Sequence, residues 1–422
     1  MDIGSISLLI LVLVIAVGFF MKINVGILAV LAATILGYGS GLFTGKEIIA
    51  GFSSSLFMTL AGVTFLFAIV QENGSLELLI KKIISRIGNF VMLVPLVIFA
   101  FGWLVSASGP GLIPTAALVA VIAIPVAHET GFNPIMLSII GVHAANAGRF
   151  TMLTVEGNLI TSLLEEQGYT ENIMMPLCIS VTILSILLSF ISYVFYKGYK
   201  VHGIGLEKEK VEHEKFTYQQ IASLIGMLVM TFLILVMKFE VGLAAFAVAT
   251  VLIILRACDE KTAIKKMPWS TIMLVIGVGV LMNLVIELGG IDLLASYLSS
   301  IMTAKTASAL SGLTAGILSW FSSTLGVVIP TLVPTTSTLI AGLGGNVTVL
   351  EIVAAIVFAS STAGISPAST AGALIMGACA SDEKFSKKYQ PDKLFIELFV
   401  WAVVGIAVIV ILCLFGYFSW FA

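Results

Sequence analysis

Charged residues are scarce in this chain of 422 amino acids, since Asp, Glu, Lys and Arg together make up 10% of it. Soluble globular domains carry roughly 25%. Apolar residues reach 59% and the mean hydropathy is +1.13, so a soluble globular protein is excluded. Apolar runs of about 20 residues recur along the chain, whereas strands of a membrane barrel would be alternating segments of about 10. The composition predicts an all-α polytopic membrane protein.

Cysteine and catalytic motifs are also scarce. The four cysteines stand singly in or beside apolar runs, so no disulfide framework or metal spacing is visible. Gly277-Val278-Gly279 is too short to indicate a nucleotide site, and no Walker or kinase signature appears. The first apolar run, from Ser5 to Phe20, lacks preceding basic residues and a cleavage site, so we expect a retained span. We expect no enzyme activity and no cofactor.

The sequence repeats itself at a displacement of about 216 residues. Five landmarks recur at offsets of 215 to 217. They pair Gly62 with Gly277, Trp103 with Trp320, Ile113-Pro114-Thr115 with Ile329-Pro330-Thr331, 144–148 with 360–364, and 157–160 with 372–375. Matching halves with coincident polar breaks are typical of secondary transporters. We predict a first repeat at 1–198, a linker at 199–218 and a second repeat at 219–422.

Each half is expected to cross the membrane five times, which gives about 10 transmembrane helices plus two re-entrant hairpins. The first half divides into 5–20, 24–43, 54–71, an amphipathic 76–87, arms 90–107 and 112–127, a broken span 134–166, and 173–198. The second divides into 219–237, 240–256, 269–288, an amphipathic 291–303, arms around 322–328, a broken span 349–381, and 394–420. The arms could also cross as pairs, but the segments 106–111 and 322–327 favour chain reversals.

Basic residues predict the orientation. With Met1 on one face, 17 Lys and Arg fall on the opposite face and three on the same face, and Arg149 remains inside the membrane. Because Lys and Arg in short loops stay in the cytoplasm, both termini are expected to be external and the linker cytoplasmic. An odd number of crossings in each half makes the two repeats inverted. We expect a multi-pass protein of the cell inner membrane.

Four polar breaks interrupt the apolar spans, two in each half, at 106–111, 144–148, 322–326 and 360–364. Non-helical backbone inside a bilayer must be buried in protein or line a cavity. Its carbonyls and hydroxyls suit a dehydrated Na⁺, and the helix N-termini that follow suit a carboxylate. The breaks could also serve close helix packing alone. Four matched breaks favour a cation-coupled carrier of organic anions.

The breaks supply the candidate site residues. Those assigned to substrate are small hydroxyl or amide residues and one arginine: Ser108, Asn146, Arg149, Thr151, Thr324, Thr331, Ser361, Thr362 and Ser366. Those assigned to sodium offer a carbonyl or side-chain oxygen: Ser106, Gly111, Ala145, Asn146, Gly148, Ser322, Ser323, Gly326, Thr362 and Gly364.

Arg149 is the one cationic side chain predicted deep in the membrane, where an unpaired charge costs about 2.5–3.5 kcal/mol. Its partner is either a substrate carboxylate, which a guanidinium binds in a bidentate manner, or Glu156 seven residues on. His143 is either a buried structural histidine or a proton relay. Glu72 and Glu287, which match across the repeat, serve either as helix-end residues or in ion binding.

The breaks carry a resemblance to a known family. The segments 106–114, 144–148, 326–331 and 365–374 resemble the dicarboxylate/malonate carrier (MatC-type) branch of the ion transporter superfamily, which includes the divalent anion:sodium symporters. The resemblance implies inverted repeats, one cytoplasmic and one external hairpin, sodium sites at the hairpin tips, and a homodimer that works by an elevator movement. Two departures stand out: Ser-Asn-Thr is absent at both tips, and Arg149-Phe150-Thr151 replaces Ser-Pro.

These observations predict a secondary active transporter that moves a small di- or tricarboxylate with Na⁺. Within transport, the alternative is a proton-coupled carrier that uses Glu156 or His143, or an exchanger. An anion channel and a membrane-embedded enzyme are alternatives of another class. A channel would tolerate continuous pore-lining helices, and an enzyme needs a nucleophile–base pair or metal set that the intramembrane residues do not offer.

Overall fold

A computed structural model describes residues 2–87, 90–201, 214–321, 323–367, 369–381 and 391–422. Within these ranges the chain is helical and contains no strand. The helices of the first half are α1 (Ile3–Met21), α2 (Val25–Ser40), α3 (Gly45–Ala50), α4 (Ser54–Glu72), α5 (Ser75–Ile87), α6 (Val94–Ala107), α7 (Leu112–Thr130), α8 (Pro134–Gly148), α9 (Val155–Glu166) and α10 (Met174–Phe195). Those of the second half are α12 (Tyr218–Leu235), α13 (Val241–Ile254), α14 (Glu260–Lys266), α15 (Trp269–Glu287), α16 (Gly290–Ile301), α17 (Ala307–Phe321), α18 (Ile329–Leu332), α19 (Thr336–Gly342), α20 (Val349–Ala363), α21 (Thr370–Ser381) and α23 (Pro391–Leu414).

Several of these helices are long and apolar enough to cross a membrane. Among the described residues, five stretches have the length and apolar composition of a membrane span: α7, α10, α15, Thr324–Gly342 and Lys393–Leu414. Helices α4 and α5 have them only when taken together, as a pair that is bent by 61°. Eight further apolar helices have 10–17 residues. The all-helical architecture is that of a polytopic membrane protein, while the expected number of crossings stays a prediction.

Helix ends follow the local sequence, and the predicted breaks lie at helix ends. Helix α6 ends at Ala107 and α7 begins at Leu112, on either side of the polar segment 108–111. Helix α8 begins at Pro134, where the Asn133 side chain accepts hydrogen bonds from two free amides of the first turn. Because Pro lacks an N–H, the first helical position suits it. In the second half, Ser323 caps a π-helical turn at Thr324–Val328.

The first helices of each half pack against the opposite half. Helix α2 crosses α15 where Gly26 meets Gly277, and α13 crosses α4 where Gly242 meets Gly62. A Cβ on any of these four glycines would lie within 3.0 Å of backbone atoms of the facing helix. Small residues of this kind allow helix backbones to approach closely in membranes. The two crossings are equivalent under the displacement seen in the sequence.

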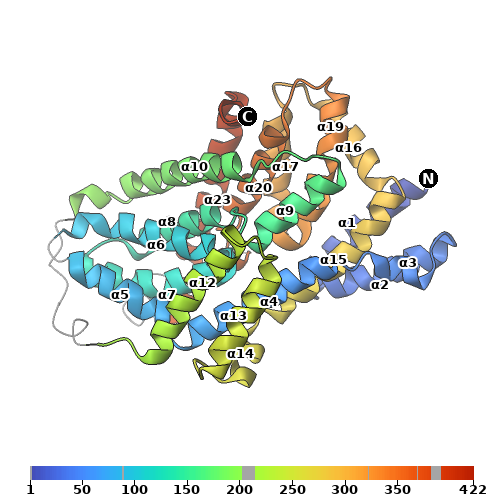
Figure 1. The fold of residues 1–422 in the computed structure, drawn as a ribbon. Coiled ribbons are helices and arrows are strands. Elements are labelled where there is room, and N and C mark those ends of the chain that lie inside the picture. Colours follow the sequence, from blue (N-terminus) through green and yellow to red (C-terminus); the bar gives the residue numbers. More distant parts are fainter. Residues whose placement is uncertain (1, 88–89, 202–213, 322, 368, 382–390) are drawn as a thin grey trace.

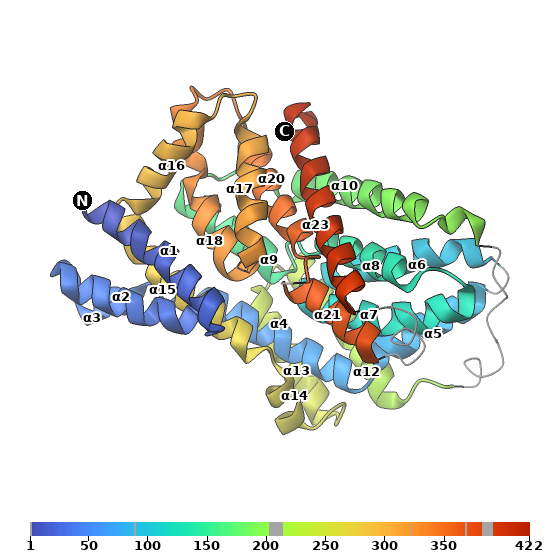
Figure 2. The ribbon, with the colours of Figure 1, turned by 180° about the vertical axis from the view of Figure 1, so that it is seen from behind.

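Helices α8 and α20 each pack against several other helices. In Figure 1, α6, α7 and α8 lie at one end, and α1, α2 and α3 lie at the other. Helix α8 packs against α6, α7 and α10, while α20 packs against α17, α23 and α10. Figure 2 shows α23 beside α17, α20 and α21. Every residue from Ile135 to Gly148 of α8 is buried, so its C-terminal end lies inside the protein.

Candidate functional site

The C-terminal ends of α8 and α20 meet in the interior. The Asn146 side chain donates from Nδ2 to the Ser361 carbonyl at 3.1 Å. Arg149, which caps α8, approaches the Ser361 hydroxyl with Nη1 at 3.4 Å. Both helices end at breaks predicted from the sequence, 144–148 and 360–364. The structure therefore brings Asn146, Arg149 and Ser361 together from two halves of the chain.

Arg149 forms a buried ion pair with Glu156. Its Nη2 lies 2.8 Å and its Nε 2.9 Å from the same Glu156 oxygen, Oε1. The two residues are 3% and 4% exposed. Of the two partners left open by the sequence, the structure shows Glu156. The guanidinium also lies 5.6 Å from the centroid of the Phe150 ring.

The first turn of α9 presents Glu156 to this site. Thr154 caps the helix, since its hydroxyl accepts a hydrogen bond from the Gly157 amide at 3.1 Å. The same hydroxyl lies close to the Arg149 carbonyl, to which it donates. Thr154 thereby fixes the turn between the arginine and the carboxylate. Sequence reasoning missed this residue, although a Thr just before a helical run with an acidic residue in the first turn is an N-cap signal.

Gly111 places the start of α7 against Glu156. Its φ of +70° lies in the left-handed region that favours glycine. A Cβ on this residue would stand 2.6 Å from Glu156 Oε2 and 2.8 Å from Oε1. The backbone at the N-terminus of a 19-residue helix thus approaches the carboxylate closely. This end of a helix carries partial positive charge, which favours an anion.

Hydroxyl groups connect the arms beside each break to the broken helices. In the first half, Ser106 donates to the Ala145 carbonyl at 2.7 Å and Thr151 to the Ala107 carbonyl at 2.8 Å. In the second half, Thr324 donates to the Ser360 carbonyl at 3.0 Å. Ser319 also reaches that carbonyl, at 2.7 Å, and was not predicted. Hydroxyls on α6 and α17 therefore satisfy carbonyls near the ends of α8 and α20.

Two buried side-chain oxygens near these helix ends have no hydrogen-bond partner among the described residues. Asn146 Oδ1 and Thr362 Oγ1 lie in residues of 0% exposure and accept or donate no hydrogen bond within the described part of the chain. Most buried polar atoms in proteins are paired, so such exceptions are consistent with a ligand or a functional role. Both residues were predicted as sodium and substrate candidates.

The remaining predicted residues lie around the same breaks, in several environments. Gly148 packs against Trp103 and Ser106 of α6. Ser108 donates to Val105, Ser323 accepts from the Gly326 amide, and Gly364 accepts from the Gly372 amide. Thr331 faces Met282 of α15, at 3.9 Å from its sulfur, and Ser366 is buried. Ser322 lies outside the described residues.

The other ionisable candidates, His143, Glu72 and Glu287, lie in different surroundings. His143 is 1% exposed, and its Nδ1 has no partner among the described residues, so it is buried but not fully satisfied. Glu72 pairs with Lys266, and Glu287 accepts a hydrogen bond from Asn283 at 3.1 Å. Both are helix-end contacts. The described residues contain no group of three or more His, Cys, Asp or Glu side chains that could hold a metal ion.

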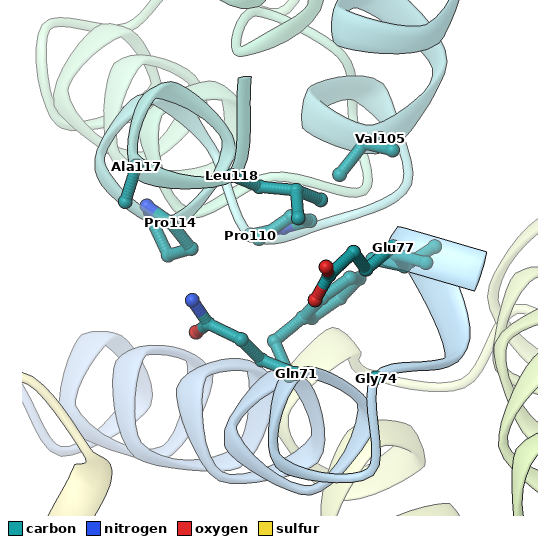
Figure 3. Close-up of a pocket in the computed structure, with 10 residues that line it drawn as sticks. Gln71, Gly74, Glu77, Val105, Pro110, Pro114, Ala117 and Leu118 are labelled. Carbon is teal, nitrogen blue, oxygen red and sulfur yellow. The ribbon is translucent and has the colours of Figure 1, made fainter. Parts of the chain in front are cut away.

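Two cavities flank the arms at equivalent positions of the two halves. One, of about 200 Å³, lies between α4 and α7, and Figure 3 shows Gln71 reaching from α4 toward Pro110 and Pro114. The other, of about 290 Å³, lies against α15 and α18 and is lined by Met282, Ile286 and Pro330. Ile286 and Pro330 follow Gln71 and Pro114 by 215 and 216 residues. The second cavity is also lined by polar groups of α4 and α9: Ser55, Thr59, Asn158, Ser162 and Glu166.

Comparison with known proteins bears on this arrangement. Residues 1–149 match the family model described as the N-terminus of the dicarboxylate carrier protein MatC. The resemblance to the dicarboxylate carriers is confirmed. No curated protein matches the sequence. The matched region ends at Arg149, so it contains α1 to α8 and the first two breaks.

Solved structures resemble the fold over most of its length. The YdaH transporter of Alcanivorax borkumensis has a TM-score of 0.56 at 12% identity, over 87% of each chain. MtrF of Neisseria gonorrhoeae, described among antimetabolite efflux pumps, has a TM-score of 0.52 at 12% identity, over 87% of this chain and 82% of its own. At this identity the likeness concerns the fold. The proteins that this chain resembles are transporters and not enzymes.

Proposed function

We propose that this protein is a secondary active transporter that moves a small di- or tricarboxylate across the membrane together with Na⁺. The observation that carries the proposal is Arg149, a buried guanidinium at the meeting point of two broken helices. The MatC match supports a carboxylate as the transported anion. A buried arginine is suited to such a substrate because its planar fork matches a carboxylate.

The substrate is proposed to bind between α8 and α20. Arg149 supplies the positive charge, while Asn146 and the Ser361 hydroxyl offer neutral polar groups for the remaining carboxylate oxygens. The start of α7 at Gly111 contributes the positive end of a helix. A second carboxylate of the substrate would lie toward the equivalent segment of the other half, around Thr324.

Sodium is proposed to bind beside the substrate at the helix breaks. Support comes from Asn146 Oδ1 and Thr362 Oγ1, which are buried oxygens without hydrogen-bond partners in the part of the chain that the structure describes. Neutral oxygens of this kind, with freed backbone carbonyls, are the ligands that broken helices offer to Na⁺ in transporters. The Nδ1 of buried His143, which has no hydrogen-bond partner within the described ranges, is the observation that favours proton coupling as the alternative.

Transport is proposed to proceed by alternating access of two inverted repeats, with one re-entrant hairpin in each. The repeats are supported by the two equivalent helix crossings, α2 with α15 and α13 with α4, and by the two equivalent cavities. The family resemblance suggests an elevator movement and a homodimer. The basic residues support external termini and a cytoplasmic linker, most of which lies at 202–213, outside the described residues.

Substrate class is tested by uptake into proteoliposomes containing the purified protein. Malonate, succinate and citrate are compared with acetate, and we expect uptake of the di- or tricarboxylates alone. Arg149→Gln should abolish this uptake, whereas Lys305→Gln, an exposed cation far along the chain, should leave it unchanged. Equal uptake by the Arg149→Gln variant would contradict the proposed site.

A further inference from the structure

The Glu156 carboxylate occupies the position that suits an incoming carboxylate. Its Oε1 contacts Nη2 at 2.8 Å and Nε at 2.9 Å, so it fills the Nε/Nη2 face of the guanidinium. The second bidentate face, formed by Nη1 and the other N–H of Nη2, lies toward Ser361, 3.4 Å from Nη1. A dicarboxylate could use the Nε/Nη2 face only by displacing Glu156.

The backbone at Gly111 provides room for this carboxylate. The left-handed φ of +70° and the absence of a Cβ let the start of α7 come close to both Glu156 oxygens. The first amides of a helix have no partner within the helix, and they favour a negative group. Arg149 and α7 thus form a surface for an anion, and the protein's own side chain fills it.

Two polar atoms near the ends of α8 and α20 are left without partners among the described residues. Asn146 Oδ1 and Thr362 Oγ1 are fully buried and have no partner in the described part of the chain. Asn146 is tied through its Nδ2 to Ser361, the residue that also approaches Arg149. Asn146 Oδ1, which is linked to Arg149 through Ser361, is therefore the atom that supports a further ligand in this site.

On the basis of the function proposed above, we propose that Glu156 is an internal stand-in for the substrate carboxylate. In the empty carrier it neutralises Arg149, which would otherwise be an unpaired charge inside the membrane. An arriving dicarboxylate takes over the Arg149 contacts and displaces Glu156. Arg149 is then paired in both the empty and the loaded states, and the Na⁺ proposed to enter with the substrate balances the charge of the displaced Glu156 carboxylate, so both states can move through the membrane.

The proposal predicts opposite effects on binding and on net transport. Glu156→Gln keeps the size of the side chain but removes the competing charge. Malonate should bind about tenfold more tightly or better, a factor that corresponds to ~1.4 kcal/mol. Net uptake into empty proteoliposomes should fall, because the empty carrier returns with an unpaired arginine. Exchange against internal malonate should persist, because the loaded carrier remains paired.

A matched control and a second variant make the test decisive. Glu165→Gln changes an exposed carboxylate on the same helix, and it should alter neither affinity nor the ratio of exchange to net uptake. If Glu156→Gln cannot be purified, Glu156→Asp takes its place, because it withdraws the carboxylate by one methylene. This variant should also bind malonate more tightly and raise the ratio of exchange to net uptake. Malonate should also raise the melting temperature of the variant more than that of the wild type.

Two results would overturn the inference. Unchanged or weaker malonate binding in both Glu156 variants would show that the carboxylate is not a competitor. An unchanged ratio of exchange to net uptake would show that it does not serve the empty carrier. If the wild-type protein neither binds nor carries a dicarboxylate, the proposed function itself is wrong, which is a separate outcome.

Discussion

The Arg149–Glu156 pair makes a quantitative prediction about stability. Replacing Arg149 by Gln leaves a carboxylate that is 4% exposed without its partner. The two contacts of 2.8 and 2.9 Å are charge-assisted hydrogen bonds, each with a net worth of about 1.5–3 kcal/mol. Removing one partner of a buried pair costs about 3–5 kcal/mol. We expect Arg149→Gln to lower the free energy of unfolding by about that amount.

The double variant Arg149→Gln/Glu156→Gln should recover most of the loss. Two amides replace two charges, so no unpaired charge remains and the side chains can hydrogen-bond each other.

Unfolding in detergent without substrate measures these quantities through a double-mutant cycle. The cycle should give a coupling energy of at least about 2 kcal/mol between the two positions. If the single variants each lose less than about 1 kcal/mol and their effects add, the ion pair contributes little. The account of Arg149 as a charge that always needs a partner would then be wrong.

Three further changes test other parts of the site. Asn146→Leu and Thr362→Val should each abolish sodium-driven concentrative uptake, because an apolar side chain replaces a buried oxygen; full uptake in both variants would remove them from the sodium site. Gly111→Ala should abolish malonate uptake, since its Cβ would stand 2.6 Å from Glu156 Oε2, whereas Gly39→Ala has open space around it and should transport normally. Cysteines placed at Asn346 and in the 202–213 segment should react with impermeant reagents from opposite faces, with Asn346 external. Labelling from the same face would contradict the inverted arrangement.

The helix breaks could be predicted from the sequence because their signals are local. Clusters of Ser, Gly, Pro and Asn inside apolar runs cannot continue a membrane helix, and α6, α7 and α8 end or begin at these clusters. The amphipathic segments 76–87 and 291–303 likewise correspond to α5 and α16. The same local reasoning identified Asn146, Arg149 and Ser361, which the structure brings together.

The partners of these residues could not be predicted because they depend on long-range packing. Asn146 meets Ser361 across 215 positions, and Gly26 meets Gly277 through an exchange of helices between the halves. The role of Gly111 beside Glu156 depends on how the start of α7 docks onto α9. The splitting of the second arm into a π-helical turn, α18 and α19 also has no counterpart in the first half, where α7 is continuous.

Sodium-driven uptake of a dicarboxylate is the measurement that tests the central proposal most directly. Proteoliposomes containing the purified protein are loaded with potassium buffer and diluted into buffer containing labelled malonate, with either sodium or choline outside. We predict accumulation above the external malonate concentration with an inward sodium gradient, and none with choline. Accumulation that is independent of sodium, or uptake that stops at equal concentrations under every gradient, would contradict the proposal.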